Sequence, residues 1–157
     1  MPNTPLPPTK QRDHHRAESE EALAQARAIF QSAWSHIEPR VESGTARLPR
    51  EIIWLGGAPG AGKGTNTPFI LRERGITAPP IVTSDLLDAP EMRAIKDAGN
   101  LVGDADVVRL LFDRLLEPAH AAGVVVDGFP RTRVQVECVK LLYEKMLHLR
   151  ATNRGTS

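Results

Sequence analysis

Residues 51 to 65 read Glu-Ile-Ile-Trp-Leu-Gly-Gly-Ala-Pro-Gly-Ala-Gly-Lys-Gly-Thr, and this stretch decides the fold. Its first part, residues 51–55, is a short, mostly apolar run of the kind that forms a buried strand. Residues 57–65 then contain four glycines, a lysine and a threonine. Glycine lets the backbone turn tightly and approach a ligand closely, and a helix that starts after such a loop offers N–H groups to phosphate. The stretch therefore predicts a strand, a phosphate-binding loop and a helix, in that order.

We expect this loop to hold the polyphosphate of a nucleoside triphosphate. Backbone N–H groups would surround the phosphates, and Lys63 would add a point charge for the β- and γ-phosphates. A flexible glycine linker is the alternative interpretation, which the fixed placement of four glycines around one lysine disfavours. The residues expected to bind the nucleotide are Gly57, Gly60, Ala61, Gly62, Lys63, Gly64 and Thr65.

The composition excludes several classes of partner. The chain has 157 residues, 41% hydrophobic and 25% charged, which is typical of one soluble domain with an ordinary core. Its net charge is +1, and no basic stripe is interleaved with its few aromatic residues, so we expect no nucleic-acid partner. Cys138 is the only cysteine, and no apolar run approaches transmembrane length. These features predict a cytoplasmic protein without a membrane partner.

The chain divides into four parts. Residues 1–16 hold four prolines and a polar run, which predicts a disordered tail. Residues 17–44 show apolar residues at spacings of three and four, typical of an amphipathic helix that Pro39 should bend or end. Trp34 is expected to anchor this helix to the core. Residues 45–150 are expected to form the nucleotide-binding domain, and residues 151–157 a frayed end.

Apolar strand-like runs alternate with helical patterns along residues 45–150. Such alternation predicts βαβ units and a short parallel sheet in an α/β fold. Ligands bind at the carboxyl ends of parallel strands. The phosphate-binding loop, residues 83–85 and residues 127–128 each follow a predicted strand, so we expect them to meet in one crevice.

Asp127 closes the apolar run Val124–Val126, a pattern that supports Mg²⁺ in phosphate-binding-loop proteins. A helix cap or an ion pair is the alternative role for an acid at that place. Gly128 and Pro130 restrict the backbone that follows, so Arg131 should be held rigidly. A planar guanidinium suits phosphate oxygens.

Two motifs resemble the signatures of the adenylate kinase family of nucleoside monophosphate kinases. One is Gly57-Ala-Pro-Gly-Ala-Gly-Lys-Gly-Thr65, in which a glycine separates the lysine from the hydroxyl residue as it does in that family. The other is Asp127-Gly-Phe-Pro-Arg-Thr132. Between them, Thr83-Ser-Asp85 is similar to a Thr-Gly-Asp motif, and residues 99–104 resemble the segment that lines the monophosphate site. The resemblance covers about residues 51–147 and implies a P-loop nucleoside triphosphate hydrolase-like fold.

The resemblance also implies a reaction, the transfer of the γ-phosphoryl group of ATP to AMP or a related nucleoside monophosphate. Its implied catalytic residues are Lys63, Asp127 and Arg131. Asp127 would organise Mg²⁺ and its waters, with Asp85 as a second candidate acting through water. The acceptor would be bound by Thr83, Val102, Arg131 and Gln135, of which Gln135 would read the adenine.

The sequence departs from the family in three respects. Asp88 stands where the family has an arginine that clamps the acceptor phosphate, and Arg93 is a candidate substitute. The segment between Asp85 and Asp104 is shorter, and the family's lid and C-terminal part have no counterpart. Residues 52–55 should then form a sheet edge, to be covered by the N-terminal helix, by self-association with a partner chain, or by the rest of a longer enzyme of which this chain is a fragment.

These departures leave three functions open. The first is a nucleoside monophosphate kinase. The second is a non-catalytic ATP-binding module, and the third is a kinase for a different small acceptor.

Overall fold

The structure, a computed structural model, describes residues 8–56 and 63–155, with the side chains of residues 15–56 and 67–152. Helices and strands alternate after a long first helix. The elements in chain order are α1 (Pro8–Glu42), β1 (Ile52–Leu55), α2 (Lys63–Arg74), β2 (Ile81–Val82), α3 (Thr83–Leu87), α4 (Pro90–Asp97), α5 (Asp104–Leu115), the 3-10 helix η1 (Pro118–His120), β3 (Val124–Asp127) and α6 (Arg133–Gly155).

The three described strands form one parallel sheet in the order β1-β3-β2. Ile52 of β1 is opposite Val124, and Ile81 of β2 is opposite Val126. The central strand β3 is the most buried, since Val124, Val125 and Val126 are all 0% exposed. The predicted α/β fold with a short parallel sheet is therefore confirmed.

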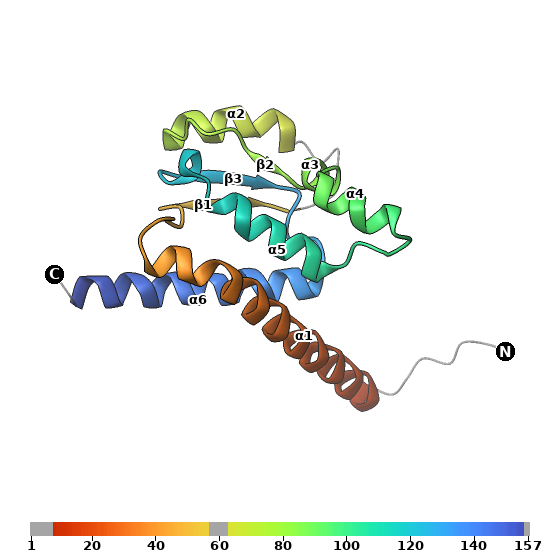
Figure 1. Cartoon of the computed structure of the whole chain (residues 1–157). Coiled ribbons are helices and arrows are strands. Elements are labelled where there is room, and N and C mark those ends of the chain that lie inside the picture. Colours follow the sequence, from red (N-terminus) through yellow and green to blue (C-terminus); the bar gives the residue numbers. More distant parts are fainter. Residues whose placement is uncertain (1–7, 57–62, 156–157) are drawn as a thin grey trace.

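Helices cover both faces of the sheet (Figure 1). Because successive strand residues point to opposite faces, Val124 and Val126 enter the main core with α5 and α6, whereas Val125 faces a smaller cluster beside α2. That smaller cluster also contains Ile76 and Ala78. Helix α1 lies outside α5 and α6 and forms a further layer on that side (Figure 1).

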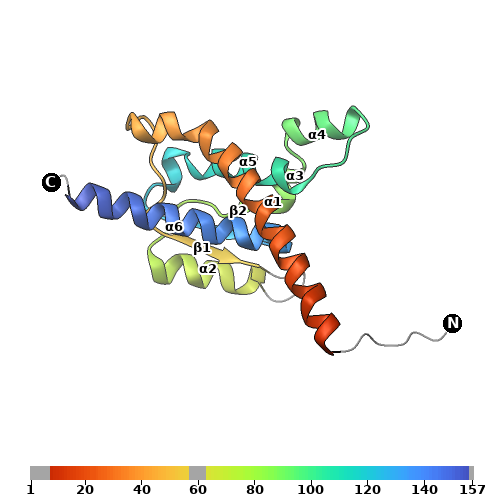
Figure 2. The same ribbon diagram turned by 90° about the horizontal axis from the view of Figure 1, so that it is seen from below.

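Helix α1 crosses the two helices beneath the sheet (Figure 2). Ile37 is 0% exposed and Trp34 is 5% exposed, both within the main core. The indole Nε1 of Trp34 donates a hydrogen bond to Oε2 of Glu38 at 2.6 Å, and Lys145 Nζ lies 5.3 Å from the centre of the indole ring. The prediction that Trp34 anchors this helix is confirmed.

The ends of the long helices differ from the prediction. Helix α1 begins at Pro8, so the predicted disordered tail was wrong for residues 8–16, and residues 1–7 lie outside the described chain. Proline is tolerated at a helix start, and the lysine, glutamine, arginine and alanine that follow are good helix formers. At its other end α1 includes Pro39 and stops at Glu42, within the predicted bounds, whereas α6 extends to Gly155 rather than fraying from residue 151.

Helices α3, α4 and α5 follow one another between β2 and η1. Thr83 begins α3 directly after Val82, the last residue of β2. Asp88 and Ala89 separate α3 from α4, since Pro90 begins the next helix. Gly103 is the N-cap of α5, and its N–H donates to Oδ2 of Asp106 at 3.0 Å.

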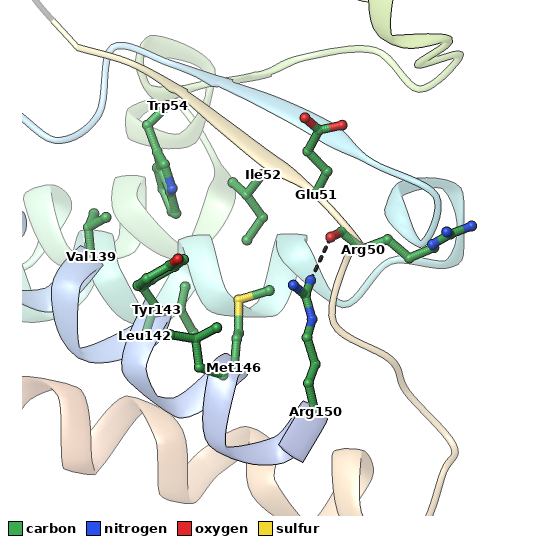
Figure 3. Close-up of a pocket in the computed structure, with 10 residues that line it drawn as sticks. Arg50, Glu51, Ile52, Trp54, Val139, Leu142, Tyr143, Met146 and Arg150 are labelled. Atoms are coloured by element: carbon green, nitrogen blue, oxygen red, sulfur yellow. Dashed lines mark hydrogen bonds between the residues drawn. The ribbon is translucent and has the colours of Figure 1, made fainter. Parts of the chain in front are cut away.

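Strand β1 lies at an edge of the three-stranded sheet, as the sequence predicts. Helix α1 does not pack on this edge but on α5 and α6. Beside β1, a cavity of about 200 Å³ separates Ile52 and Trp54 from Leu142, Tyr143 and other residues of α6 (Figure 3). Self-association through this edge stays a prediction.

At the end of this cavity, Nη2 of Arg150 donates a hydrogen bond to the carbonyl oxygen of Arg50 at 2.6 Å (Figure 3). This contact ties α6 to the linker before β1. Over the described residues, we find no helix with the length and apolar character needed to cross a bilayer. The cytoplasmic location stays a prediction.

Replacement of Ile37 by alanine tests whether α1 is an integral part of the domain. Ile37→Ala should lower the free energy of unfolding by about 2–5 kcal/mol, because the side chain is fully buried. Urea unfolding followed by circular dichroism measures this. Gln31→Ala, at an exposed position of the same helix, should change it by less than about 0.5 kcal/mol. Equal effects of the two substitutions would show that α1 is not packed as described.

Cys138 is a buried, free thiol on α6, and its Sγ lies 3.7 Å from the carbonyl oxygen of Ala26 in α1. Burial, with smaller contributions from the negative charges of Asp104 and Glu137, raises the pKa of this thiol to about 11. The thiol is therefore protonated at neutral pH and packs as a small apolar group.

This raised pKa makes native Cys138 unreactive. At pH 8, alkylation of the native chain should be slower than alkylation in urea by a factor on the order of a hundred, because only the thiolate reacts. Mass spectrometry of iodoacetamide-treated protein measures both rates. Since the pKa is higher in the folded chain, this group's contribution to stability should be present below pH 8 and lost as pH rises toward 11. Rapid native alkylation would contradict the buried position.

Candidate nucleotide site

Asp127 is the last residue of the central strand β3 and pairs with both neighbouring strands. It is opposite Leu55 in β1 and opposite Val82 in β2. Directly after it, the N–H of Gly128 donates to the carbonyl oxygen of Leu55 at 2.8 Å. The carboxyl ends of all three strands therefore lie at one edge. Thr83 and Asp127 come together there as predicted, whereas residues 57–62 of the phosphate-binding loop lie outside the described residues.

Thr83 and Asp127 are in direct contact at this edge. Thr83 is 5% exposed, and its hydroxyl donates a hydrogen bond to the carbonyl oxygen of Asp127 at 3.1 Å. The carboxylate of Asp127 is itself partly buried, with Oδ1 fully inaccessible to solvent. Asp85 lies in the first turn of α3 and is exposed.

The turn after β3 brings Arg131 next to Thr83. Gly128 has φ of +84°, a conformation that glycine adopts without strain. A Cβ at Gly128 would lie 3.3 Å from Nη2 of Arg131 and 3.4 Å from Oγ1 of Thr83. Phe129 is 1% exposed and packs against Trp54 with ring centres 5.8 Å apart, so the turn is fixed to the core while Arg131 stays exposed.

The phosphate-binding loop leads into α2. Gly57, Gly60, Ala61 and Gly62 lie outside the described residues. Helix α2 begins at Lys63, so Lys63, Gly64 and Thr65 form its first turn, where free N–H groups and the helix dipole favour phosphate. Before the loop, Gly56 lies close to the turn after β3, since a Cβ there would be 3.2 Å from the carbonyl oxygen of Pro130.

Residues 56–152 match the model of a protein family described as AAA domain. This match begins at the phosphate-binding loop, includes β2, β3 and most of α6, and covers more than half of the chain. The chain belongs to the AAA-domain family. Its fold is that of a P-loop nucleoside triphosphate hydrolase, and the family indicates a nucleotide-binding, kinase-like function that generally uses ATP and Mg²⁺.

The AAA domain offers carboxylates rather than a preformed cage for a metal ion. Among its described side chains, no three histidines, cysteines or acids come together as a metal-binding group. Mg²⁺ keeps several waters and commonly takes one or two carboxylates together with substrate phosphates. Asp127 fits this role because it is opposite Leu55, the last β1 residue before the loop.

The other predicted acceptor residues of the AAA domain differ in their surroundings. Val102 is half-buried and packs against the main core. Gln135 is 7% exposed and hydrogen-bonded within the protein. Asp88 and Arg93 are exposed on the arm formed by α3 and α4, and the described contacts do not join either of them to Arg131.

Sequence reasoning missed Asp104 and Thr132 as parts of this site. The hydroxyl of Thr132 donates to Oδ1 of Asp104 at 3.0 Å and accepts the N–H of Gln135 at 3.1 Å. The second of these contacts is half of a capping box, and its signal, a threonine three residues before a glutamine at a helix start, was present in the sequence. The contact with Asp104 joins residues 28 positions apart and had no local signal.

Gly128→Ala tests the close packing of this turn. The new Cβ would be strained by the positive φ and would press on Thr83 and Arg131, so we expect the free energy of unfolding to fall by about 2–4 kcal/mol. Gly99→Ala is the matched control, because Gly99 also has φ of +84° but has open space around it. Gly99→Ala should lower the free energy of unfolding by only about 1 kcal/mol. Urea unfolding of both variants measures the difference, and equal losses would exclude crowding at Gly128.

Proposed function

We propose that this AAA domain is a nucleoside monophosphate kinase that transfers the γ-phosphoryl group of ATP to AMP or a related monophosphate. The observation that carries the proposal is the position of Arg131, which is exposed beside Thr83 with its Nη2 close to Gly128, at the carboxyl edge of the sheet. A guanidinium at this place is suited to an acceptor phosphate next to the donor site.

This reaction makes modest demands on the protein. The acceptor phosphate is already a nucleophile, so no strong general base is needed, and the rate depends on positioning and charge neutralisation. We assign Arg131 to hold the acceptor phosphate and Lys63 to neutralise charge on the group in transfer. The N–H groups at the start of α2, together with Gly57, Gly60, Ala61 and Gly62, would hold the donor phosphates.

Asp127 would hold the metal ion, with Asp85 acting through water. When bound, Mg²⁺ would neutralise charge on the phosphates and fix their orientation. The hydroxyl of Thr83 donates to the backbone carbonyl oxygen of Asp127, so Thr83 keeps the end of β3 and the start of α3 together. The acceptor nucleoside would lie between this edge and Val102, with Gln135 behind Arg131.

Asp88 favours the second candidate, an ATP-binding module without phosphoryl transfer. This acid is exposed at the end of α3, close in sequence to the proposed acceptor site, and would repel an incoming phosphate. Both candidate functions predict ATP binding, but only the kinase predicts phosphoryl transfer.

Phosphoryl transfer itself decides between them. The purified chain is incubated with MgATP and each of AMP, GMP, CMP and UMP, and nucleotides are separated by chromatography. We expect a diphosphate product with at least one acceptor and a loss of more than about a hundredfold in Lys63→Ala, because Lys63 neutralises charge in the transition state. ATP binding that depends on Lys63, without any product, would support the binding module and overturn the kinase.

A further inference from the structure

We infer that Asp104 and Gln135 together position Arg131, so that Asp104 of α5 is a positioning residue of the acceptor site that does not itself touch the acceptor. This inference rests on the proposed function for its kinetic consequences. Its structural part concerns hydrogen bonds that the chain makes by itself.

The amide of Gln135 is held at both ends. Its Oε1 accepts the backbone N–H of Arg131 at 2.8 Å, and its Nε2 donates to Oδ1 of Asp104 at 3.0 Å. The orientation of the amide is fixed by these partners, because an N–H needs an acceptor and a carboxylate can only accept. With 7% exposure, the side chain has little surface left for contact with a base.

Asp104 is the other fixed point of this group. Its Oδ1 accepts hydrogen bonds from both Thr132 and Gln135, and hydrogen bonds to a charged acceptor are stronger than those between neutral groups. Thr132 in turn accepts the N–H of Gln135. The carboxylate therefore holds the first turn of α6 and, through Gln135, the backbone on which Arg131 is carried.

This arrangement connects two parts of the proposed acceptor site. Asp104 is the first residue of α5 and follows the segment 99–103 that contains Val102, whereas Arg131 lies in the turn after β3. A shift of the α5 N-terminus would therefore be passed to the Arg131 backbone. Loss of the Asp104 carboxylate should weaken acceptor binding and leave the ATP site, at the start of α2, unchanged.

Four variants test this inference. Asp104→Ala removes the acceptor of both bonds and should raise KM for AMP roughly fivefold to fiftyfold, with KM for ATP changed less than about twofold. Asp104→Asn keeps an Oδ1 acceptor and should stay within about threefold of wild type. Gln135→Glu places two carboxylates together and should be impaired like Asp104→Ala. The double variant Asp104→Asn, Gln135→Glu restores a donor facing an acceptor and should recover most of the lost affinity.

Asp106 provides the matched control. It lies in the same turn of α5, and its carboxylate accepts a hydrogen bond from the N–H of Gly103. Two double-mutant cycles compare fold-changes in KM for AMP. The fold-changes of Asp106→Ala and Gln135→Ala should multiply in the double variant, as for independent residues. The double variant of Asp104→Ala and Gln135→Ala should be much less impaired than the product of the two single effects. If Gln135 reads the adenine directly, Asp104→Ala and Gln135→Ala would each raise KM for AMP and leave KM for CMP unchanged. That result would overturn the inference.

A measurement without turnover separates this inference from the proposed function. The backbone amide of Arg131 in a ¹⁵N-labelled chain should shift in both Gln135→Ala and Asp104→Ala, and return toward the wild-type position in the double variant Asp104→Asn, Gln135→Glu. If the wild type shows no phosphoryl transfer, the proposed function fails. The shift of the Arg131 amide resonance still tests whether Asp104 acts on the Arg131 backbone through Gln135. An Arg131 amide that does not respond to Asp104→Ala overturns the inference whatever the activity.

Discussion

The pairing of β3 with both neighbouring strands is the constraint on which the rest of the structure depends. One residue, Asp127, is opposite the last residue of β1 and the last residue of β2. Because all three strands are parallel and end at the same level, the segments that follow the strands all start at one edge of the sheet. The start of α3 and the turn that carries Arg131 are neighbours for this reason. The same pairing explains why β3 must be apolar on both faces.

The two faces of that sheet are covered very differently. On one side lie α5 and α6 with α1 as an outer layer, and on the other the small cluster of Ile76, Ala78 and Val125 lies beside α2. The main core therefore fixes the turn after β3 through Phe129, whereas α2, the helix that follows the phosphate-binding loop, lies on the more thinly covered side. The turn that carries Arg131 and the helix that follows the loop are thus supported by cores of very different size.

Most of the fold could be predicted from local pattern. The strand runs, the glycine-rich loop and the apolar spacing of the long helices each lie in a continuous stretch, and parallel topology then brings their ends together. What sequence could not give was contact between distant residues. Asp104 is an example, because nothing near it in the sequence signals that Gln135 and Thr132 lie opposite. At residues 8–16 the polar composition is typical of a disordered tail, whereas the helix propensity of several of these residues favours the helix that the structure shows.

The β1–β3 pairing also bears on how the molecule folds. When Ile52 pairs with Val124, the chain between them, which includes α2 to α5, has to close into a loop, whereas the contacts within each long helix are local. Closing so large a loop costs chain entropy before any contact compensates for it. We therefore expect helices to form early and the sheet edge to be completed late. The surface that meets the nucleotide would be the last part of the domain to acquire its shape.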